Sequence, residues 1–367
     1  MCDAVFLRYE RSISLNRQTI RKKQKTKSTP LFFLMVLLFS FFPLQGQASE
    51  GTLGFYVTPE LPDSQVEGSS NYFHLTLAPG QTEELSLTLQ NAGSEAIHVQ
   101  VTPHTAYTNV HGVVEYGKEA AEPDPTLTHS LDTLIEPSGV IELAGNETKM
   151  ITIPLHMPEE AFDGFLAGGL RITEVNEEQE EPTSDEEGVA IKNEFAYVVG
   201  VVVSNSQDSV QPDLDLLEVF ADQLNHRNVI SATIQNFTPG FVNRMAVEAT
   251  VQRAGEDAVL YEASEEMMQM APNSHFHFPI SLNGDRFQAG NYVLHLKATS
   301  GDEEWEWTRP FTIEGETARS LNRQDVTIDT SINWWMVGAI LLVVLLLGVI
   351  LYLLIQKKKA RETEQEL

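Results

Sequence analysis

Two histidines, His275 and His277, are the residues whose type and spacing come closest to a chemical site, and they flank Phe276. Alternate residues of a β-strand point to the same face, so the two imidazoles would lie side by side, as ligands of one metal ion must. The sequence indicates no third ligand. We therefore expect both histidines on the solvated outer face of a strand whose phenylalanines point inward, and we predict no metal site and no cofactor.

Catalytic motifs are missing from the sequence. There is no His-Glu-x-x-His zinc motif, no Gly-x-Ser-x-Gly nucleophile elbow, no phosphate-binding glycine loop and no calcium-loop signature. Carboxylates are so frequent that two of them close together say little about glycoside hydrolysis. The acidic segment 174–187 lacks the spacing of a calcium site and is expected to be a solvated loop. We predict a protein that is not an enzyme and has no catalytic residues; its binding residues stay unknown at this stage.

The elements between residues 51 and 316 are predicted to be β-strands, because apolar and polar residues alternate. Turn residues such as Asn91-Ala92-Gly93 and Asn283-Gly284 separate the runs at the spacing of sandwich strands. No amphipathic helix is predicted outside the membrane. A stretch of this length exceeds one ordinary sandwich, so we predict an all-β ectodomain of two tandem immunoglobulin-like β-sandwich domains. The clearest runs are Leu85–Leu89, Ile97–Val101, Ile151–Leu155, Ile230–Ile234, Met245–Val251, Phe276–Leu282, Tyr292–Ala298 and Trp305–Ile313.

The boundary between the two domains is predicted near Ser204. Segment 193–203 is almost entirely apolar, which is typical of a core strand that would close the first domain, and a polar connection follows it. The first sandwich would then occupy 51–204 and the second 205–316. Alternation stops after this point, so residues 317–333 are predicted to form a polar stalk.

Apolar segments flank this body on both sides. Basic residues, a short apolar stretch and small residues at Gly46 and Ala48 predict a signal peptide at 1–48; a wrongly assigned start codon would explain its long N-terminal extension. The run 334–355 holds 22 residues without a charge, enough for one C-terminal transmembrane helix. Four basic residues follow, which predicts a cytoplasmic tail at 356–367 and a single-pass protein of the cell membrane with its N-terminal ectodomain outside, facing the cell wall.

Composition restricts the compartment and the partners. Residues 49–355 carry 47 acidic and 12 basic side chains, and this charge argues against nucleic acid and anionic lipid as partners. The only cysteine, Cys2, precedes the signal segment, so the mature chain would form no disulfide. An extracellular two-domain protein without disulfides is typical of the Gram-positive bacterial surface.

Several short motifs carry a family resemblance. In the first domain they are Gly54–Pro59, Pro62, Gln65, Tyr72–Leu75, Pro79–Gln81, Asn91, Thr105–Asn109, Gly112, Tyr116, Phe162–Gly164 and Gly168-Gly169. In the second domain they are Tyr197–Val201, Pro212–Leu214, Ile234–Asn236, Pro272–Ser274 and Phe276–Pro279. Together they resemble the WxL-interacting protein family, whose second domain begins near 185, earlier than our boundary. The resemblance implies peptidoglycan as partner of the first domain, host extracellular proteins as partners of the second, and a complex with WxL-motif proteins.

The glycine motifs also have a physical interpretation that is separate from the resemblance. Phe162-Asp163-Gly164, ahead of Gly168-Gly169, predicts tight turns beside a strand edge where another backbone approaches closely. We expect a structural role for these residues rather than contact with a ligand.

Two functions remain open from the sequence. The first is a membrane-anchored surface protein that attaches to peptidoglycan and docks WxL-motif proteins and host extracellular proteins. The chain has no tandem Trp-x-Leu motif, so it would be the partner of a WxL protein. The second is a chaperone-like assembly factor that delivers an extracellular subunit by strand addition. A scaffold would persist in a complex with its partner, whereas an assembly factor would release it.

Overall fold

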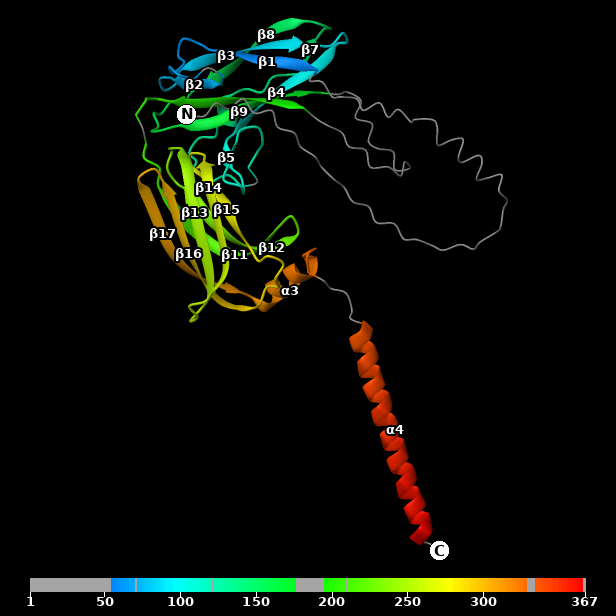
Figure 1. The fold of residues 1–367 in the computed structure, drawn as a ribbon. Coiled ribbons are helices and arrows are strands. Elements are labelled where there is room, and N and C mark those ends of the chain that lie inside the picture. Colours follow the sequence, from blue (N-terminus) through cyan, green and yellow to red (C-terminus); the bar gives the residue numbers. More distant parts are fainter. Residues whose placement is uncertain are drawn as a thin grey trace, which may run out of the picture.

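The computed structural model describes residues 54–69, 71–120, 122–175, 195–208, 210–328 and 334–365. These residues form two β-sandwich domains followed by a long C-terminal helix (Figure 1), so the predicted all-β class is confirmed. The predicted signal peptide and most of the acidic segment 174–187 lie outside the described residues.

The first domain packs a three-stranded sheet, in the order β1-β3-β8, against a five-stranded sheet, in the order β2-β10-β9-β4-β7. Strands β10 and β2 are parallel, and the other neighbours are antiparallel. The elements are β1 (Phe55–Glu60), β2 (Phe73–Thr76), β3 (Thr82–Asn91), β4 (Ile97–Thr105), the hairpin β5 (Tyr107–Thr108) and β6 (Val114–Glu115), α2 (Leu131–Leu134), β7 (Ile141–Leu143), β8 (Thr148–His156), β9 (Leu166–Glu174) and β10 (Ala196–Ser204).

The core of the first domain follows the predicted alternation. Leu85, Leu87 and Leu89 of β3 are fully buried, while the residues between them reach the surface in part. They pack in one cluster with Val99 and Val101 of β4, which belongs to the opposite sheet. Each buried leucine stabilises the fold by about 1.5–3 kcal/mol relative to an exposed one. The repeat of two therefore decides which face of each strand points inward.

Strand β10 belongs to the first sandwich by its hydrogen bonding. It pairs with β9 on one side and with β2 on the other, so it is an interior strand of the five-stranded sheet. Val201 and Val203 are fully buried in the core of the first domain. Val202, which points to the opposite face, is buried in a separate apolar cluster, so both faces of this end of the strand are covered, which explains why it is apolar.

The second domain packs a three-stranded sheet, β11-β12-β15, against a four-stranded sheet, β14-β13-β16-β17. All neighbouring strands are antiparallel. The buried faces of β13, β15 and β16 form half of the core, as the alternation predicts. The strands are β11 (Leu214–Leu224), β12 (Arg227–Asn236), β13 (Val242–Arg253), β14 (Val259–Met270), β15 (Ser274–Ser281), β16 (Gly290–Ser300) and β17 (Glu303–Ile313).

Helix α3 (Gly315–Gln324) corrects two expectations, namely that no amphipathic helix lies outside the membrane and that 317–333 forms a stalk. The helix packs on the second domain through Ala318 and Leu321. Its Asn322 accepts the backbone N–H of Phe287 at 2.8 Å, and Ile328 beyond it is buried. The stalk prediction is therefore wrong for 317–328, and 329–333 lie outside the described residues. The helix was missed because so few of its residues are apolar.

Helix α4 (Trp334–Gln365) contains the predicted membrane span. Its stretch Trp334–Tyr352 is long and apolar enough to cross a bilayer, and none of it is buried against the rest of the protein. The helix continues beyond this stretch into the basic segment that begins at Lys357. Among the described residues, α4 is the one helix with these properties.

Candidate functional site

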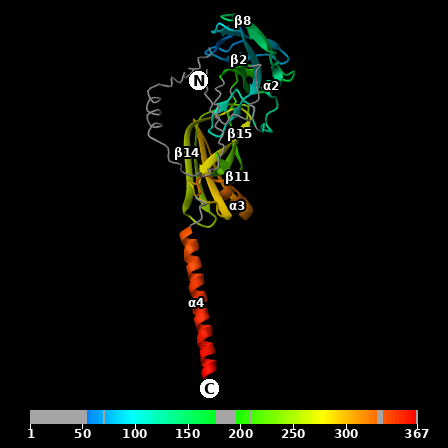
Figure 2. The same cartoon turned by 90° about the vertical axis from the view of Figure 1, so that its right-hand side faces the viewer.

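The first domain is stacked on one end of the second (Figure 2), and the contact joins segments far apart in the sequence. The hairpin β5–β6, the loop 122–127 and the turn at Gly164 come from the first domain, and the ends of β12, β14 and β15 come from the second. Apolar residues of both domains form one cluster between them. Its buried members are Ala106, Val114, Ala167, Val202 and Ala271, and Tyr72, Tyr116, Phe165 and Phe241 pack around them.

Glycine permits the closest backbone approaches across this junction. Gly164 has a φ of +73°, and a Cβ at this position would lie 2.3 Å from the carbonyl oxygen of Pro239. Phe165 donates its backbone N–H to that same oxygen at 2.8 Å. Gly112 has a φ of +63°, and a Cβ there would lie 2.3 Å from the side chain of Met268. Only glycine fits both the backbone angle and the space, which confirms the predicted close approach at Gly164.

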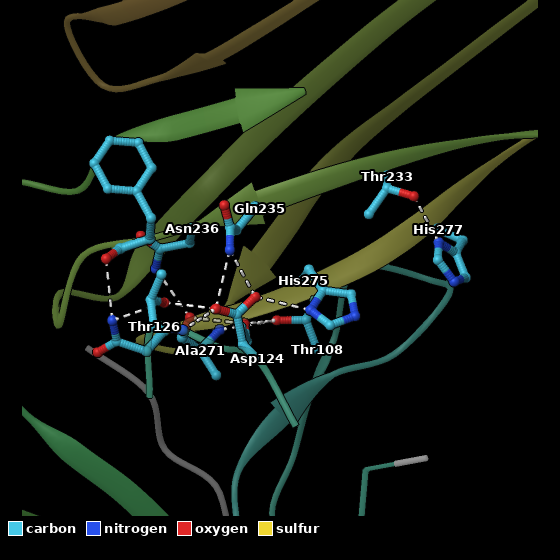
Figure 3. Close-up of polar contacts among 12 residues, drawn as sticks. Thr108, Asp124, Thr126, Thr233, Gln235, Asn236, Ala271, His275 and His277 are labelled. Carbon is cyan, nitrogen blue, oxygen red and sulfur yellow. Dashed lines mark hydrogen bonds and ion pairs between the residues drawn. The ribbon is translucent and has the colours of Figure 1, made fainter. Parts of the chain in front are cut away.

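Asp124 is the polar centre of the junction (Figure 3), and its side chain is only 1% exposed. Gln235 of β12 donates from Nε2 to both carboxylate oxygens at 3.0 Å. Nδ1 of His275, on β15, lies 2.8 Å from Oδ2. Within the loop, Thr126 donates its backbone N–H and its hydroxyl to Oδ1 at 2.9 and 2.6 Å. A carboxylate of the first domain is thus enclosed and held by side chains of the second.

These contacts shift the pKa of both partners. Burial alone would raise the pKa of Asp124, but the hydrogen bonds from His275, Thr126 and Gln235 outweigh it and lower the pKa from 3.8 to about 2. The hydrogen bond to Asp124 raises the pKa of His275 above its ordinary 6.5, against the opposing effect of burial. The site therefore favours a carboxylate facing an imidazolium.

A second set of hydrogen bonds crosses the junction beside Asp124. The backbone N–H of Ala271 donates to Thr108 Oγ1 at 3.0 Å. Ser274 uses its hydroxyl hydrogen on the carbonyl oxygen of Ala271 at 2.8 Å, so Thr108 is the donor in the 2.6 Å contact between the two hydroxyls. Asn273 donates from Nδ2 to Thr126 Oγ1 at 3.1 Å. The motifs 105–109 and 272–274, which carry the family resemblance, therefore meet at the junction.

A cavity of about 770 Å³ opens between the two domains next to these contacts. Residues 105–110, described residues between Glu119 and Ser130, and Asp132 of α2 form one wall, and Asn273 to His277 form the other. The carboxylates of Glu119, Glu122 and Asp132 lie on this lining, and no lysine or arginine is among the described residues that line it. Its volume is in the range of ligand pockets, and its lining combines these acidic groups with apolar residues such as Val110, Leu127 and Phe276.

The two histidines do lie on the same outer face of β15, but the prediction that this face is solvated is wrong. The loop of Asp124 covers His275, whose side chain is 18% exposed. His277 is half-buried, with Nδ1 2.9 Å from Thr233 Oγ1 and its ring edge-on to Phe220 at 5.3 Å. No group of three or more His, Cys, Asp or Glu side chains in the described part of the chain is arranged to hold a metal ion.

Sequence reasoning missed Asp124, and it named Gln235 only as part of the motif 234–236, without a contact. The available signal for Asp124 was local: the residue stands between Pro123 and Pro125, with Thr126 two positions on, a pattern typical of a structured turn. That pattern identifies a turn but not what the carboxylate contacts, because both partners lie more than 100 positions away. For Gln235 the strand pattern gave no signal of a polar contact.

Comparison with known protein families shows which family the chain belongs to. Residues 55–174 match the peptidoglycan binding domain of WxL Interacting Protein, and residues 186–323 match its host binding domain. The chain belongs to the WxL-interacting protein family. The match to the family's second domain begins before β10, although β10 is paired within the sheet of the first domain. In this family member, the first sandwich therefore includes one strand, β10, that lies within the match to the family's second domain.

No curated protein matches the chain. Solved structures similar to this family member include a chaperone–tip adhesin complex of CFA/I fimbriae biogenesis, at 11% identity over 71% of this chain and 99% of that one, with a TM-score of 0.28. The YadV chaperone is 12% identical over 71% of this chain and all of its own, with a TM-score of 0.29. The Pseudomonas aeruginosa CupB2 chaperone is 15% identical over 65% and 97%, with a TM-score of 0.27. At these TM-scores the likeness carries no argument about function.

Proposed function

We propose that this protein is a non-enzymatic scaffold of the Gram-positive cell surface, exported by the signal peptide and anchored by α4. Its first domain attaches to peptidoglycan, its second contacts host extracellular proteins, and the ectodomain docks WxL-motif proteins. The observation that carries the proposal is the succession of a peptidoglycan binding domain and a host binding domain in one chain. Neither attachment requires chemistry.

The junction supports a scaffold, because a protein that links two surfaces must transmit force between its domains. An apolar cluster, backbone hydrogen bonds and the enclosed Asp124 all join the two sandwiches. Domains joined by a linker alone move independently of each other. Buried apolar and polar contacts between two domains restrict that movement. The proposal therefore treats the described parts of the two sandwiches as one body with two binding ends.

The proposed anchoring rests on α4 and the charges that flank it. Trp334 and Trp335, exposed at 73% and 91%, would lie at the outer interface, and Lys357–Lys359 would lie on the cytoplasmic side. Protease treatment of intact cells whose wall has been removed tests this orientation. We expect loss of the ectodomain and protection of an epitope placed after residue 367; removal of that epitope in intact cells would overturn it.

The alternative, an assembly factor that works by strand addition, needs an open sheet edge. Strand β14, which pairs with β13 alone among the described strands, has register shifts that break its pairing and carries Glu262, Glu265 and Glu266. Bulges and charges are the devices that hinder strand addition. At the other edge of this sheet, β17 contains Pro310, which cannot donate a ladder hydrogen bond. The two edges of this sheet are therefore poor sites for strand addition, which supports the scaffold.

Cosedimentation of the purified full chain, in detergent, with protein-free Gram-positive sacculi tests the wall attachment. We expect the chain to pellet with intact sacculi and to stay soluble after the sacculi have been digested to fragments. A chain that stays soluble with intact sacculi, with and without divalent cations, would overturn the wall-binding part. Release of soluble wall fragments by the chain alone would overturn the non-enzymatic part.

Docking of a WxL-motif protein is tested separately, by mixing the two purified proteins and measuring complex formation and lifetime. A complex that persists through gel filtration supports the scaffold. Release of the partner once it is assembled would instead support the assembly factor.

A further inference from the structure

The hydrogen bond between Asp124 and His275 joins two domains through one titratable pair. The residues lie 151 positions apart, and both are largely shielded from water, with side-chain exposures of 1% and 18%. Gln235, the other partner of Asp124 from the second domain, does not titrate. A change in the charge of His275 therefore acts directly on the contact between domains.

The charged groups around His275 all favour its protonated form. Asp124 faces it from the first domain, Glu122 lies in the same loop, and Glu218 lies on β11, which is separated from β15 by β12 in the same sheet. The ring of His277, on the same face of β15, is 6.2 Å away and is held by Thr233 of its own domain. Three carboxylates from two domains thus stabilise one imidazolium.

We propose that Asp124 and His275 form a pH-dependent latch, which holds the two domains together most firmly in mildly acidic medium and loosens as His275 loses its proton. The proposal stands apart from wall binding, because it concerns only how the two sandwiches are joined. A scaffold with such a latch would present its two binding ends in a more rigid arrangement at acidic pH.

The direction follows from the two pKa shifts. The pKa of His275 is higher in the folded protein than 6.5, so its contribution is complete below pH 6.5 and is lost as the pH rises through the raised pKa. The pKa of Asp124 is lowered from 3.8 to about 2, so its contribution is complete above pH 3.8 and is lost as the pH falls toward 2. Both contributions are complete together between these limits, from 3.8 to 6.5.

Loss of the proton loosens the junction and does not separate the domains. Neutral His275 can still donate from Nδ1, and Gln235 and Thr126 still hold Asp124. The apolar cluster between the domains contains no titratable group that is fully buried. The expected response is therefore a graded rise in local opening rather than a dissociation.

Backbone hydrogen exchange of the full chain in detergent micelles measures this opening. Three amides report on the junction, because their hydrogen bonds cross it: Ala271 to Thr108, Phe165 to Pro239 and Gln269 to Gly112. After correction for intrinsic rates, we expect their protection to fall by up to about tenfold per unit of pKa shift between about pH 6 and about pH 8. Amides in the centres of β3 and β13 serve as the reference and should not change.

Two variants of neighbouring histidines assign the effect. His275→Gln keeps a donor toward Asp124 but removes the charge. In this variant the junction amides should have the same protection at about pH 6 and about pH 8, equal to that of the wild type at about pH 8. His277→Gln, two positions along the same face, should keep the wild-type pH response. Asp124→Asn should flatten the response as His275→Gln does, which covers the case in which one variant fails to fold.

Equal protection of the wild-type junction amides at the two pH values would overturn the latch, whatever the variants show. A pH response that persists in His275→Gln, or that disappears in His277→Gln alone, would also overturn it. Failure to pellet with sacculi would leave the latch unaffected, so the two proposals can fail separately.

Discussion

The two ends of the second sandwich each bury one aspartate, and the two sites share the same local turn. Asp124 and Asp325 are each followed two residues later by a threonine, which donates its backbone N–H and its hydroxyl to Oδ1. The partner of Oδ2 differs. At Asp325 it is the backbone N–H of Asn228 at 2.8 Å, within the same domain, whereas at Asp124 it is the imidazole of His275 together with Nε2 of Gln235, both across the junction.

This difference separates a permanent site from an adjustable one. Burial opposes ionisation of Asp325, but the hydrogen bonds from Thr327 and from backbone N–H groups lower its pKa. Backbone N–H groups do not titrate, so the Asp325 site stays unchanged through neutral pH. At Asp124 one donor is a histidine, so the same turn gains a dependence on pH. The donor to the second carboxylate oxygen, Oδ2, therefore decides whether such a turn has a fixed structural role or forms a contact that changes with pH.

Removing the carboxylate at the permanent end should have the largest effect. Asp325→Ala takes away the partner of the Asn228 N–H, a residue that is itself buried. We expect the free energy of unfolding of the second domain to fall by about 2–4 kcal/mol, because a buried donor loses a charged acceptor. Denaturant unfolding followed by tryptophan fluorescence measures it, since all four tryptophans lie after residue 304.

Asp325→Asn is the matched variant for that experiment, because it keeps one oxygen acceptor and the shape of the side chain. It should cost less than Asp325→Ala. Equal stability of wild type and Asp325→Ala would show that the turn contributes nothing to the second domain, and the comparison with Asp124 would lose its basis.

A side chain at the glycine of the junction should have the next largest effect. Gly164→Ala places a Cβ against the Pro239 carbonyl and forces alanine to a φ of +73°. We expect a loss of about 1–3 kcal/mol from the contact between domains, seen as two separate unfolding transitions in place of one. Gly139→Ala is the control, because a Cβ there meets nothing within 4 Å. A single wild-type transition in Gly164→Ala would contradict the close approach.

The pH response should distinguish the two aspartate sites in one experiment. The lowered pKa of Asp325 means that its contribution is present above pH 3.8 and is lost only as the medium becomes strongly acidic. Exchange of the Asn228 amide, corrected for intrinsic rates, should therefore stay within about twofold between about pH 6 and about pH 8, while the Ala271 amide responds. A shared response of both amides would mean that pH acts on the whole second domain and not on the latch.

The sequence was sufficient for the strands that alternate without interruption. β3, β13 and β15 were predicted because every second residue is buried, a pattern that needs no knowledge of the partner strand. β11 and β14 were missed, because a register shift after Leu216 breaks the repeat of two in β11 and most residues of β14 are exposed. Helix α3 was missed because Leu321 is its only strongly apolar residue, and one such residue does not define an apolar face.

The site could be predicted only in part. The motifs 105–109 and 272–274 were identified through the family resemblance, but their meeting at a junction depends on how two domains dock. The strand period placed His275 and His277 on one face correctly, yet it could not show that a loop of the other domain covers His275. Contacts between residues more than 100 positions apart leave no periodic trace in a sequence.

The smallest predicted effect belongs to the histidine next to the latch. His277→Gln removes the contact with Thr233 and the edge-on ring packing against Phe220. Because the residue is half-buried and its partners lie within one domain, the free energy of unfolding of the second domain should fall by about 0.5–1 kcal/mol. Denaturant unfolding followed by tryptophan fluorescence measures this loss. A loss as large as that of Asp325→Ala would contradict the ranking, because it would mean that the contacts of His277 within the sheet hold the second domain as firmly as the buried turn at Asp325 does.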